Sequence, residues 1–476
     1  MALEIYSTPE KKKKEFKPLC GSKIGMYVCG MTVYDMCHIG HARSQIVFDV
    51  ISRFLRCKGF DLTYVRNYTD VDDKIIARAN KEGVSSQELA ERYIEEFERD
   101  MDILKVKKPD IEPRATEHIP QIIEMVKILI DKGLAYESDG SVYYRVSKFR
   151  PYGYLSGRRL EEMIAGARVD IDESKEDPLD FALWKKSKPG EPLWVSPWSQ
   201  GRPGWHIECS AMSTHYLGPQ LDIHGGGKDL MFPHHENEIA QSEGVYEKTF
   251  VHYWVHNGFV TINGEKMSKS LGNFLTIREI TKTTHPEVLR LMLVSSHYRT
   301  PIDYSEDGLE TSRQSLIRFY EMLNRVRLSP EKSGEQRLTE IVQTFMTGFD
   351  EAMCDDFNTA RTIACIHELT TAVNKTINEY SDLTLSDKKL VTDAISLINN
   401  VLGILEEEPQ AFLEKIKHSG LPDAGLTESD IEAFIQERNA ARKNRDFKRG
   451  DEIRDLLKDK GIQLKDSPAG TTWEKS

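Results

Sequence analysis

The sequence predicts an α/β fold: a parallel-sheet domain split by an insertion, followed by a helical bundle and a small C-terminal unit. Near the N-terminus, an apolar stretch at 23–30, a helical spacing of apolar residues at 42–58 and a second apolar stretch at 61–67 follow one another. A strand, a helix and a strand in this order form a βαβ unit and hence a parallel, Rossmann-like sheet. Beyond about Asp303 the apolar residues recur with helical periodicity up to Leu405.

Glycines and apolar stretches support the individual elements. The first strand ends at Gly30, and Gly59 stops the helix that follows it. Two more helices are expected at about 85–104 and 119–132. Apolar stretches at 221–224 and 251–255, the first of which continues into a run of glycines, resume the sheet.

A change of composition divides the sheet domain. The region 152–205 is rich in proline and glycine and holds four of the six tryptophans, so we interpret it as an irregular insertion. A linker with proline and glycine at 419–425 follows the helical region. The predicted domains are the first half of the sheet domain at 1–120, a connective insertion at 121–205, the second half of the sheet domain at 206–255, a region with a lysine- and serine-rich loop at 256–310, a helical bundle at 311–420 and a C-terminal unit at 421–476.

Composition excludes several classes of protein. A chain of 476 residues is too long for one core. No run of apolar residues is long enough to span a bilayer, and no apolar segment follows the lysine-rich N-terminus, so we expect a cytoplasmic protein without membrane contact. The seven cysteines are scattered and form no C-x-x-C pair, which indicates buried thiols or metal ligands rather than disulfides. A net charge of −12 disfavours broad nucleic-acid binding but permits a local basic patch.

A first candidate phosphate site is His38-Ile39-Gly40-His41, between the first strand and the following helix. In open α/β sheets, ligands bind outside the carboxyl ends of the strands. The helix N-terminus there offers unpaired N–H groups and a partial positive charge, which suit a phosphate. Two imidazoles can donate hydrogen bonds to phosphoryl oxygens, and Gly40 permits close approach. A chance occurrence in a turn is the alternative for the tetrapeptide alone.

A second candidate phosphate site is Lys266-Met267-Ser268-Lys269-Ser270, in a loop flanked by glycines. Two lysines and two hydroxyls can stabilise the charge that grows on a pyrophosphate leaving group. A solvated basic turn is the commoner fate of such a run. The two motifs in this order, on either side of a sheet domain, favour the functional interpretation.

With both motifs the sequence resembles the class I aminoacyl-tRNA synthetases. The resemblance implies attack of an amino-acid carboxylate on the α-phosphorus of ATP, bound with Mg²⁺, and transfer of the aminoacyl group to tRNA. It assigns catalysis to His38, His41, Lys266 and Lys269, and ATP binding to these residues together with Gly40, Ser268 and Asp229. Little proton transfer is needed in the first step, so positioning and electrostatics supply most of the catalysis.

Histidines are concentrated in one region: seven of the fourteen lie between His206 and His256, these two included. In a helix that begins near Pro233, His234 and Glu238 share one face and could ligate zinc, with thiolates completing a tetrahedral site. Spacing alone leaves alternatives open. His235 with Glu238 or Glu236 is an equally good pair, and pairs at this spacing are more often surface hydrogen bonds.

Three segments, at 26–30, 204–210 and 232–238, resemble those of the cysteine-specific branch of the same family. The similarity to this branch extends along the whole chain. The resemblance implies one Zn²⁺ per chain, held by Cys29, Cys209, His234 and Glu238, that takes the thiolate of substrate L-cysteine. A shaped pocket rejects serine, which differs by one atom, only ~10²-fold or less. A zinc–thiolate bond discriminates further, because a neutral hydroxyl forms no bond of comparable strength.

The resemblance also assigns Cys29, Thr69, Trp205 and Asp229 to the cysteine pocket. Asp229 follows the glycine run at 225–227, where class I enzymes hold the ribose or the amino group. Core packing is the alternative for Trp205, and helix capping is the alternative for Asp229.

A basic stretch lies near the C-terminus, at Arg438–Arg449, and is expected on one helix. Phosphate contacts need such a local concentration of positive charge. Trp473 could stack on an unpaired base. A solvated helix is the alternative, but the family places an anticodon-binding module here. The resemblance therefore implies tRNA(Cys) as partner, with contacts from Arg442, Lys443, Arg445 and Trp473, and a monomeric chain.

Three functions remain to be compared. The first is the attachment of cysteine to tRNA(Cys). The second is a cysteine:amino-sugar ligase that shares the catalytic domain and zinc site but is expected to lack the C-terminal unit. The third is a zinc-stabilised RNA-binding protein without catalysis, which the two phosphate motifs disfavour.

Overall fold

The structure is a computed structural model that describes residues 1–158, 174–266, 274–418, 428–444, 446–460, 462–467 and 470–475. It divides into two compact units. The larger comprises Met1–Arg278 and Pro286–Glu406, and the smaller comprises Glu279–His285 and Glu407–Ser476.

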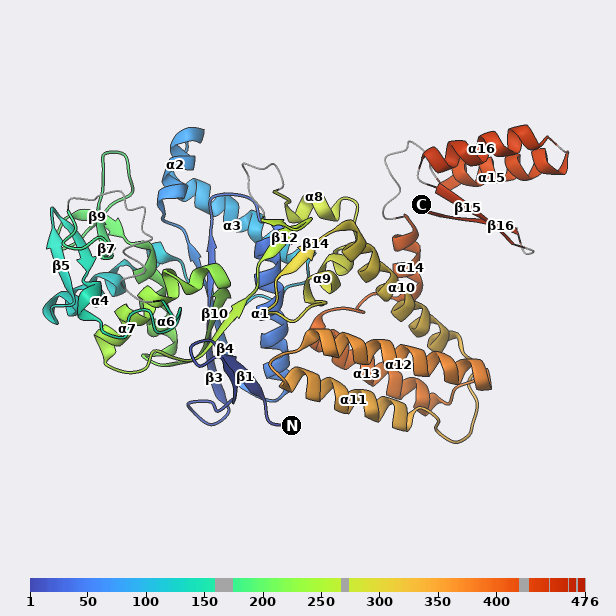
Figure 1. Ribbon diagram of the computed structural model, residues 1–476, viewed down its shortest axis with the longest axis horizontal. Coiled ribbons are helices and arrows are strands. Elements are labelled where there is room, and N and C mark those ends of the chain that lie inside the picture. Colours follow the sequence, from blue (N-terminus) through green and yellow to red (C-terminus); the bar gives the residue numbers. More distant parts are fainter. Residues whose placement is uncertain are drawn as a thin grey trace. The chain divides into compact units, whose positions relative to one another are not determined.

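A four-stranded parallel sheet with the order β11-β10-β3-β4 lies at the centre of the larger unit (Figure 1). Helix α1 (Ile39–Cys57) connects β3 to β4, and α7 (His234–Tyr246) connects β10 to β11. The strand order therefore reverses between β3 and β10, which is where α/β sheets bind ligands. The predicted parallel sheet is confirmed. Its strands are β3 (Lys23–Thr32), β4 (Asp61–Thr69), β10 (Leu221–Gly227) and β11 (Val251–Asn257).

Helix α1 begins three residues earlier than its apolar pattern predicted. The reason is capping: the His38 side chain accepts hydrogen bonds from the backbone of Gly40 and His41, so the first turn includes the candidate phosphate motif. Helix α7 likewise begins at His234, one residue after the Pro233 that was expected at its first position.

The described part of the insertion is not irregular, contrary to the prediction. It contains a five-stranded antiparallel sheet with the order β5-β6-β7-β9-β8. Its core includes the fully buried Trp184 and packs against α4 (Ile119–Asp131). Because β6 and β7 are far apart in sequence, no hairpin pattern reveals their pairing. The strands are β5 (Ala135–Ser138), β6 (Ser141–Tyr144), β7 (Phe181–Lys186), β8 (Trp194–Val195) and β9 (Gln200–Pro203).

Two small sheets at the edges of the domain were not predicted. Strands β1 (Glu4–Ser7) and β2 (Lys12–Glu15) form a hairpin, and β1 lies against β11. Strands β13 (Glu265–Lys266), β12 (Val260–Ile262) and β14 (Ile302–Tyr304) form the other sheet. Strands this short carry too little alternation to be recognised in a sequence.

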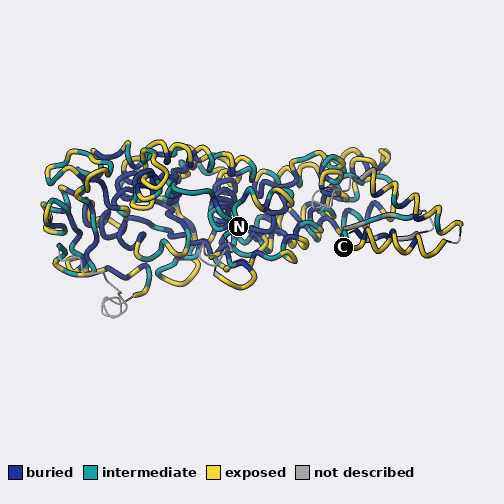
Figure 2. The backbone as a smooth tube through the Cα atoms, turned by 90° about the horizontal axis from the view of Figure 1, so that it is seen from above, coloured by how far each residue is buried: buried dark blue, intermediate teal, exposed yellow. Residues whose placement is uncertain are grey.

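The helical bundle follows the sheet domain, as predicted, and its helix α13 packs against α1. Figure 2 shows buried positions gathered in the interior and exposed positions on the outer turns. Among the described residues, no helix combines the length and apolarity needed to cross a membrane. The bundle comprises α10 (Glu306–Leu328), α11 (Thr339–Cys354), α12 (Thr359–Tyr380) and α13 (Leu385–Leu402); the other helices of the larger unit are α2 (Asp73–Glu82), α3 (Ser86–Ile103), α6 (Trp205–Leu217) and α9 (Pro286–Val294), with 3-10 turns at Ala115–His118, Val146–Lys148 and Lys228–Met231.

The smaller unit has a core of aliphatic side chains, among them Ile431, Ile453 and Leu457. Its basic stretch does not lie on one helix as predicted, because the helix ends at Lys443 and a new one begins at Phe447 with Asp446 as its N-cap. Its elements are α14 (Pro409–His418), α15 (Glu428–Lys443), α16 (Phe447–Asp459), β15 (Ile462–Ser467) and β16 (Gly470–Lys475); α8 (Ile277–Thr281) crosses the boundary between the units in sequence.

Candidate active site and metal centre

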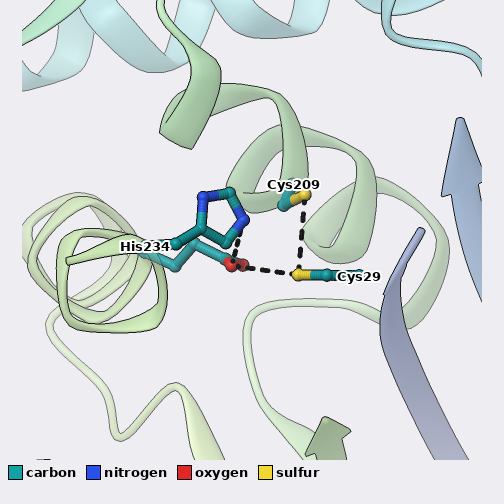
Figure 3. Close-up of side chains that lie close together, drawn as sticks. Cys29, Cys209 and His234 are labelled. Atoms are coloured by element: carbon teal, nitrogen blue, oxygen red, sulfur yellow. Dashed lines mark hydrogen bonds and ion pairs between the residues drawn. The ribbon is translucent and has the colours of Figure 1, made fainter. Parts of the chain in front are cut away.

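Four buried side chains from three elements meet near the carboxyl end of β3. Cys29 comes from β3, Cys209 from α6, and His234 and Glu238 from α7. Their potential ligand atoms all lie within 4.8 Å of one another. Figure 3 shows Cys29, Cys209 and His234 pointing toward one another from separate elements. The Sγ atoms of the two cysteines are 3.8 Å apart.

The helical geometry of α7 places two of these groups side by side. His234 and Glu238 are one turn apart, and His234 Nε2 lies 3.1 Å from Glu238 Oε1. The same carboxylate oxygen lies 3.4 Å from Cys29 Sγ. Glu238 is therefore the common neighbour of a ligand on its own helix and a ligand on the sheet.

Two further histidines hold these ligands in orientation. His206 Nδ1 lies 2.8 Å from His234 Nδ1, which leaves Nε2 of His234 toward the cluster. His224 Nε2 lies 2.9 Å from Glu238 Oε2. Ligands of metals are commonly oriented by such outer hydrogen bonds. The sequence signalled these residues only through the density of histidines between 206 and 256.

The buried groups of the cluster shift one another's pKa values. Burial raises the pKa of the Cys29 thiol well above its usual range, and the neighbouring Cys209 adds to the effect. The hydrogen bond from Cys29 lowers the pKa of Cys209 to about 6, although burial opposes it. Burial acts to raise the pKa of Glu238, but His224 and His234 hold it well below its usual range. A thiolate and a carboxylate in a buried pocket are suited to a divalent cation.

The structure excludes one of the alternative partners in α7, Glu236. The Glu236 carboxyl group accepts hydrogen bonds from the backbone N–H groups of Gly153 and Ser156, both at 2.9 Å, and so does not belong to the cluster. His235 remains an alternative, since Cys29, His224, His235 and Glu238 also lie within ligand distance of one another. His235 Nδ1 contacts His256 Nε2 at 2.9 Å.

The first phosphate motif forms the N-terminal turn of α1. His38 Nδ1 accepts hydrogen bonds from the backbone of Gly40 and His41, at 3.1 and 3.3 Å. The His41 ring stacks on the His38 ring with centroids 3.7 Å apart. Because Nδ1 of His38 is an acceptor, the neutral ring carries its proton on Nε2, where it can donate to an anion. Capping is a second role for His38 that the sequence did not reveal.

The other expected ATP residues are only partly described. Lys266 ends β13, and Ser268 and Lys269 lie outside the described residues. Asp229 is exposed on the short turn after β10.

Of the expected pocket residues, Trp205 lies beside the cluster. Thr69 is buried at the end of β4. The core-packing alternative for Trp205 is wrong: its side chain is 38% exposed, and its ring lies over His234 with centroids 4.5 Å apart.

The residues expected to contact tRNA lie in the smaller unit. Arg442 and Lys443 are exposed in the last turn of α15, and Arg445 lies outside the described residues. Trp473, on β16, packs against the core of that unit and keeps part of its surface accessible. Arg438, which opens the basic stretch, is buried.

Comparison with known proteins identifies the class. Residues 15–314 match the family model of the class I (C) tRNA synthetase catalytic domain, and residues 348–406 match the DALR domain. The fold is also that of a solved structure, Mycobacterium tuberculosis methionyl-tRNA synthetase in complex with methionyl-adenylate, with a TM-score of 0.62, 16% identity and coverage of 83% of this chain and 93% of that one. The protein is a class I aminoacyl-tRNA synthetase.

Relatives with high sequence identity show to which family within this class the chain belongs. The cysteine--tRNA ligase of Geobacter metallireducens is 54% identical over 484 residues, covering 100% of both chains. That of Pelobacter propionicus is 54% identical over 99% of both chains, and that of Desulfotalea psychrophila is 50% identical over 99% of both. This chain belongs to the cysteine--tRNA ligase family, and it is an enzyme of the ligase class.

Proposed function

We propose that this enzyme activates L-cysteine with ATP as an enzyme-bound cysteinyl adenylate and then transfers the cysteinyl group to tRNA(Cys). The family membership supports the overall reaction. The observation that carries the proposal is the buried cluster of Cys29, Cys209, His234 and Glu238 beside the point where the strand order reverses. Parallel sheets bind ligands at the point where the strand order reverses, so a thiol-binding group there would lie next to the nucleotide site.

One Zn²⁺ per chain would be held by these four residues. Two sulfur donors, one imidazole and one carboxylate are a fitting donor set for zinc, and Cys209 is disposed to ionise, because the hydrogen bond from Cys29 lowers its pKa to about 6. The alternative set with His224 and His235 would leave the Cys209 sulfur beside the metal but outside its ligand set. When bound, zinc supplies a thiolate-selective contact that a serine hydroxyl cannot match.

The residues of this chain would bind and orient the other reactants. His38 and His41 present imidazole N–H groups at the start of α1, where the helix dipole also favours the phosphates of ATP, and Gly40 leaves room for their approach. Lys266, Ser268 and Lys269 would stabilise the departing pyrophosphate with Mg²⁺. Thr69, Trp205 and Asp229 would line the cysteine and ribose sites.

The C-terminal regions would bind the tRNA. We assign the bundle at 311–420 and the unit at 421–476 to tRNA recognition, with Arg442, Lys443 and Arg445 on phosphates and Trp473 on a base. Arg442 and Lys443, in the last turn of α15, are exposed, which supports phosphate contacts. We further propose a monomer acting in the cytoplasm, which sedimentation and cell fractionation would check.

The test is cysteine-dependent exchange of pyrophosphate into ATP, followed by charging of tRNA(Cys), with zinc determined in the same preparation. We expect exchange with cysteine and not with serine, charging, and one zinc per chain. Absence of exchange would refute the proposal. Exchange without charging would point instead to a cysteine:amino-sugar ligase.

A further inference from the structure

The N-terminal segment reaches the neighbourhood of the metal cluster through Thr8, which follows strand β1. Thr8 Oγ1 lies 3.1 Å from His256 Nδ1 and 3.3 Å from the carbonyl oxygen of Trp254, both on β11. Strand β1 lies against β11, so a residue remote in sequence from every predicted site residue contacts the interior of the sheet.

From Thr8 a line of contacts leads to Cys29. His256 Nε2 lies 2.9 Å from His235 Nδ1, and His235 Nε2 lies 3.4 Å from Cys29 Sγ. The His235 side chain is completely buried, and only 5% of His256 is exposed. Each ring uses both of its nitrogens within this line, so the direction of one hydrogen bond determines the direction of the others.

Two arrangements of protons satisfy all of these contacts, because a neutral imidazole has one N–H and one lone pair. In the first, the Thr8 hydroxyl donates to His256 Nδ1, His256 donates from Nε2 to His235, and His235 donates from Nε2 to the sulfur of Cys29. In the second, the hydroxyl donates to the Trp254 carbonyl, every bond in the line reverses, and His235 turns a lone pair toward Cys29.

The charge of a ligating cysteine selects between them. A cysteine that binds a metal is a thiolate, which accepts hydrogen bonds and is repelled by a lone pair. We infer that Thr8 is a positioning residue of the cysteine-binding site: its hydroxyl, by donating to His256, sets the tautomers of His256 and His235 so that His235 donates an N–H to the sulfur of Cys29. This inference rests on the proposed zinc site.

Strand β1, which precedes Thr8, is held in place from two sides. Strand β1 pairs with β2, with Tyr6 opposite Lys13. The backbone N–H of Tyr6 also donates to the buried carboxylate of Asp356, at 2.9 Å, in the corner between α11 and α12. The backbone that leads into Thr8 is therefore anchored by β2 and by Asp356.

The test compares Thr8→Val, which keeps the shape and removes the hydroxyl, with Thr8→Ser, which keeps the hydroxyl. Zinc affinity of the full chain is measured by competition with a chromophoric chelator, and KM values for cysteine and ATP by pyrophosphate exchange. For Thr8→Val we expect about tenfold weaker zinc binding, at the lower end of the range for outer hydrogen-bond partners of metals. The KM for cysteine should rise and that for ATP should not, and Thr8→Ser should stay within about twofold of wild type.

Equal values for wild type and Thr8→Val would overturn the inference, and so would equal impairment of both variants, which would indicate a packing role. A wild-type chain that binds no zinc would instead remove the proposed function. The tautomer of His256 can also be measured without a variant at Thr8, by ¹⁵N NMR of zinc-loaded wild-type protein with labelled histidines. The His256 signal is assigned as the one that disappears from the spectrum of His256→Gln. A proton on Nε2 of His256 supports the inference, and a proton on Nδ1 contradicts it.

Discussion

Two neighbouring carboxyl groups on α7 should respond in opposite ways to the same isosteric change. Glu238 lies in the metal cluster, whereas Glu236 accepts three backbone hydrogen bonds from the turn at 153–156. We therefore expect Glu238→Gln to lose zinc while remaining folded, and Glu236→Gln to keep zinc while losing stability.

The magnitude for Glu236 follows from its contacts. Oε1 accepts from Gly153 and Leu155, at 2.9 and 3.3 Å, and Oε2 accepts from Ser156 at 2.9 Å. An amide keeps one oxygen acceptor but turns its NH₂ toward the third N–H, that of Ser156, which leaves a partly buried donor unsatisfied at a cost of about 1–3 kcal/mol. We expect Glu236→Gln to lower the free energy of unfolding by about 2 kcal/mol and Glu236→Ala, which loses all three bonds, by about 4 kcal/mol.

Denaturant unfolding of the full chain and zinc titration measure the two effects separately. The midpoint should fall for Glu236→Gln with an unchanged slope, and zinc affinity should stay within about twofold of wild type. Glu238→Gln should weaken zinc binding by more than about a hundredfold, beyond the loss seen for outer partners. The assignment would be refuted if Glu236→Gln lost zinc as completely as Glu238→Gln and kept wild-type stability.

Three further results are expected. A Cβ on Gly30 would lie 1.5 Å from the carbonyl oxygen of Asn67, so Gly30→Ala should cost about 3 kcal/mol in denaturant unfolding, whereas Gly25→Ala on the same strand, whose nearest neighbour would be 3.5 Å away, should be tolerated. Burial acts to raise the pKa of Asp387, but hydrogen bonds from Thr384 and from backbone N–H groups lower it overall; Asp387→Asn should destabilise the chain by about 1 kcal/mol above pH 5, and the difference from wild type should shrink as the pH falls below about 4. Lys269→Ala should lower kcat for pyrophosphate exchange by about 10²-fold with the KM for cysteine unchanged; equal losses in both would contradict a role on the phosphates.

Much of the fold could be predicted from local sequence patterns. The βαβ unit at 23–67, the helices of the bundle and the motif around His38 could be predicted, because apolar periodicity and short motifs depend on residues that are close in sequence. The pairing of β6 with β7 could not, because strand pairing between distant segments leaves no periodic signal. The break in the basic stretch was missed although its signal is local, since Asp446 caps the N-terminus of α16 by accepting from the backbone of Arg449.

For the site, the sequence by itself determined the two phosphate motifs and the one-turn spacing of His234 and Glu238. Similarity to the family named the four ligands, but the residues alone left His235 and Glu236 as equal candidates. Only the tertiary structure brought Cys29 within 3.8 Å of Cys209, which is 180 residues away, and turned Glu236 toward the insertion. It also placed Thr8 beside His256. The physical reason is that the spacing along α7 specifies which residues share a face, whereas the packing of α7 against the sheet and the insertion decides what each face meets.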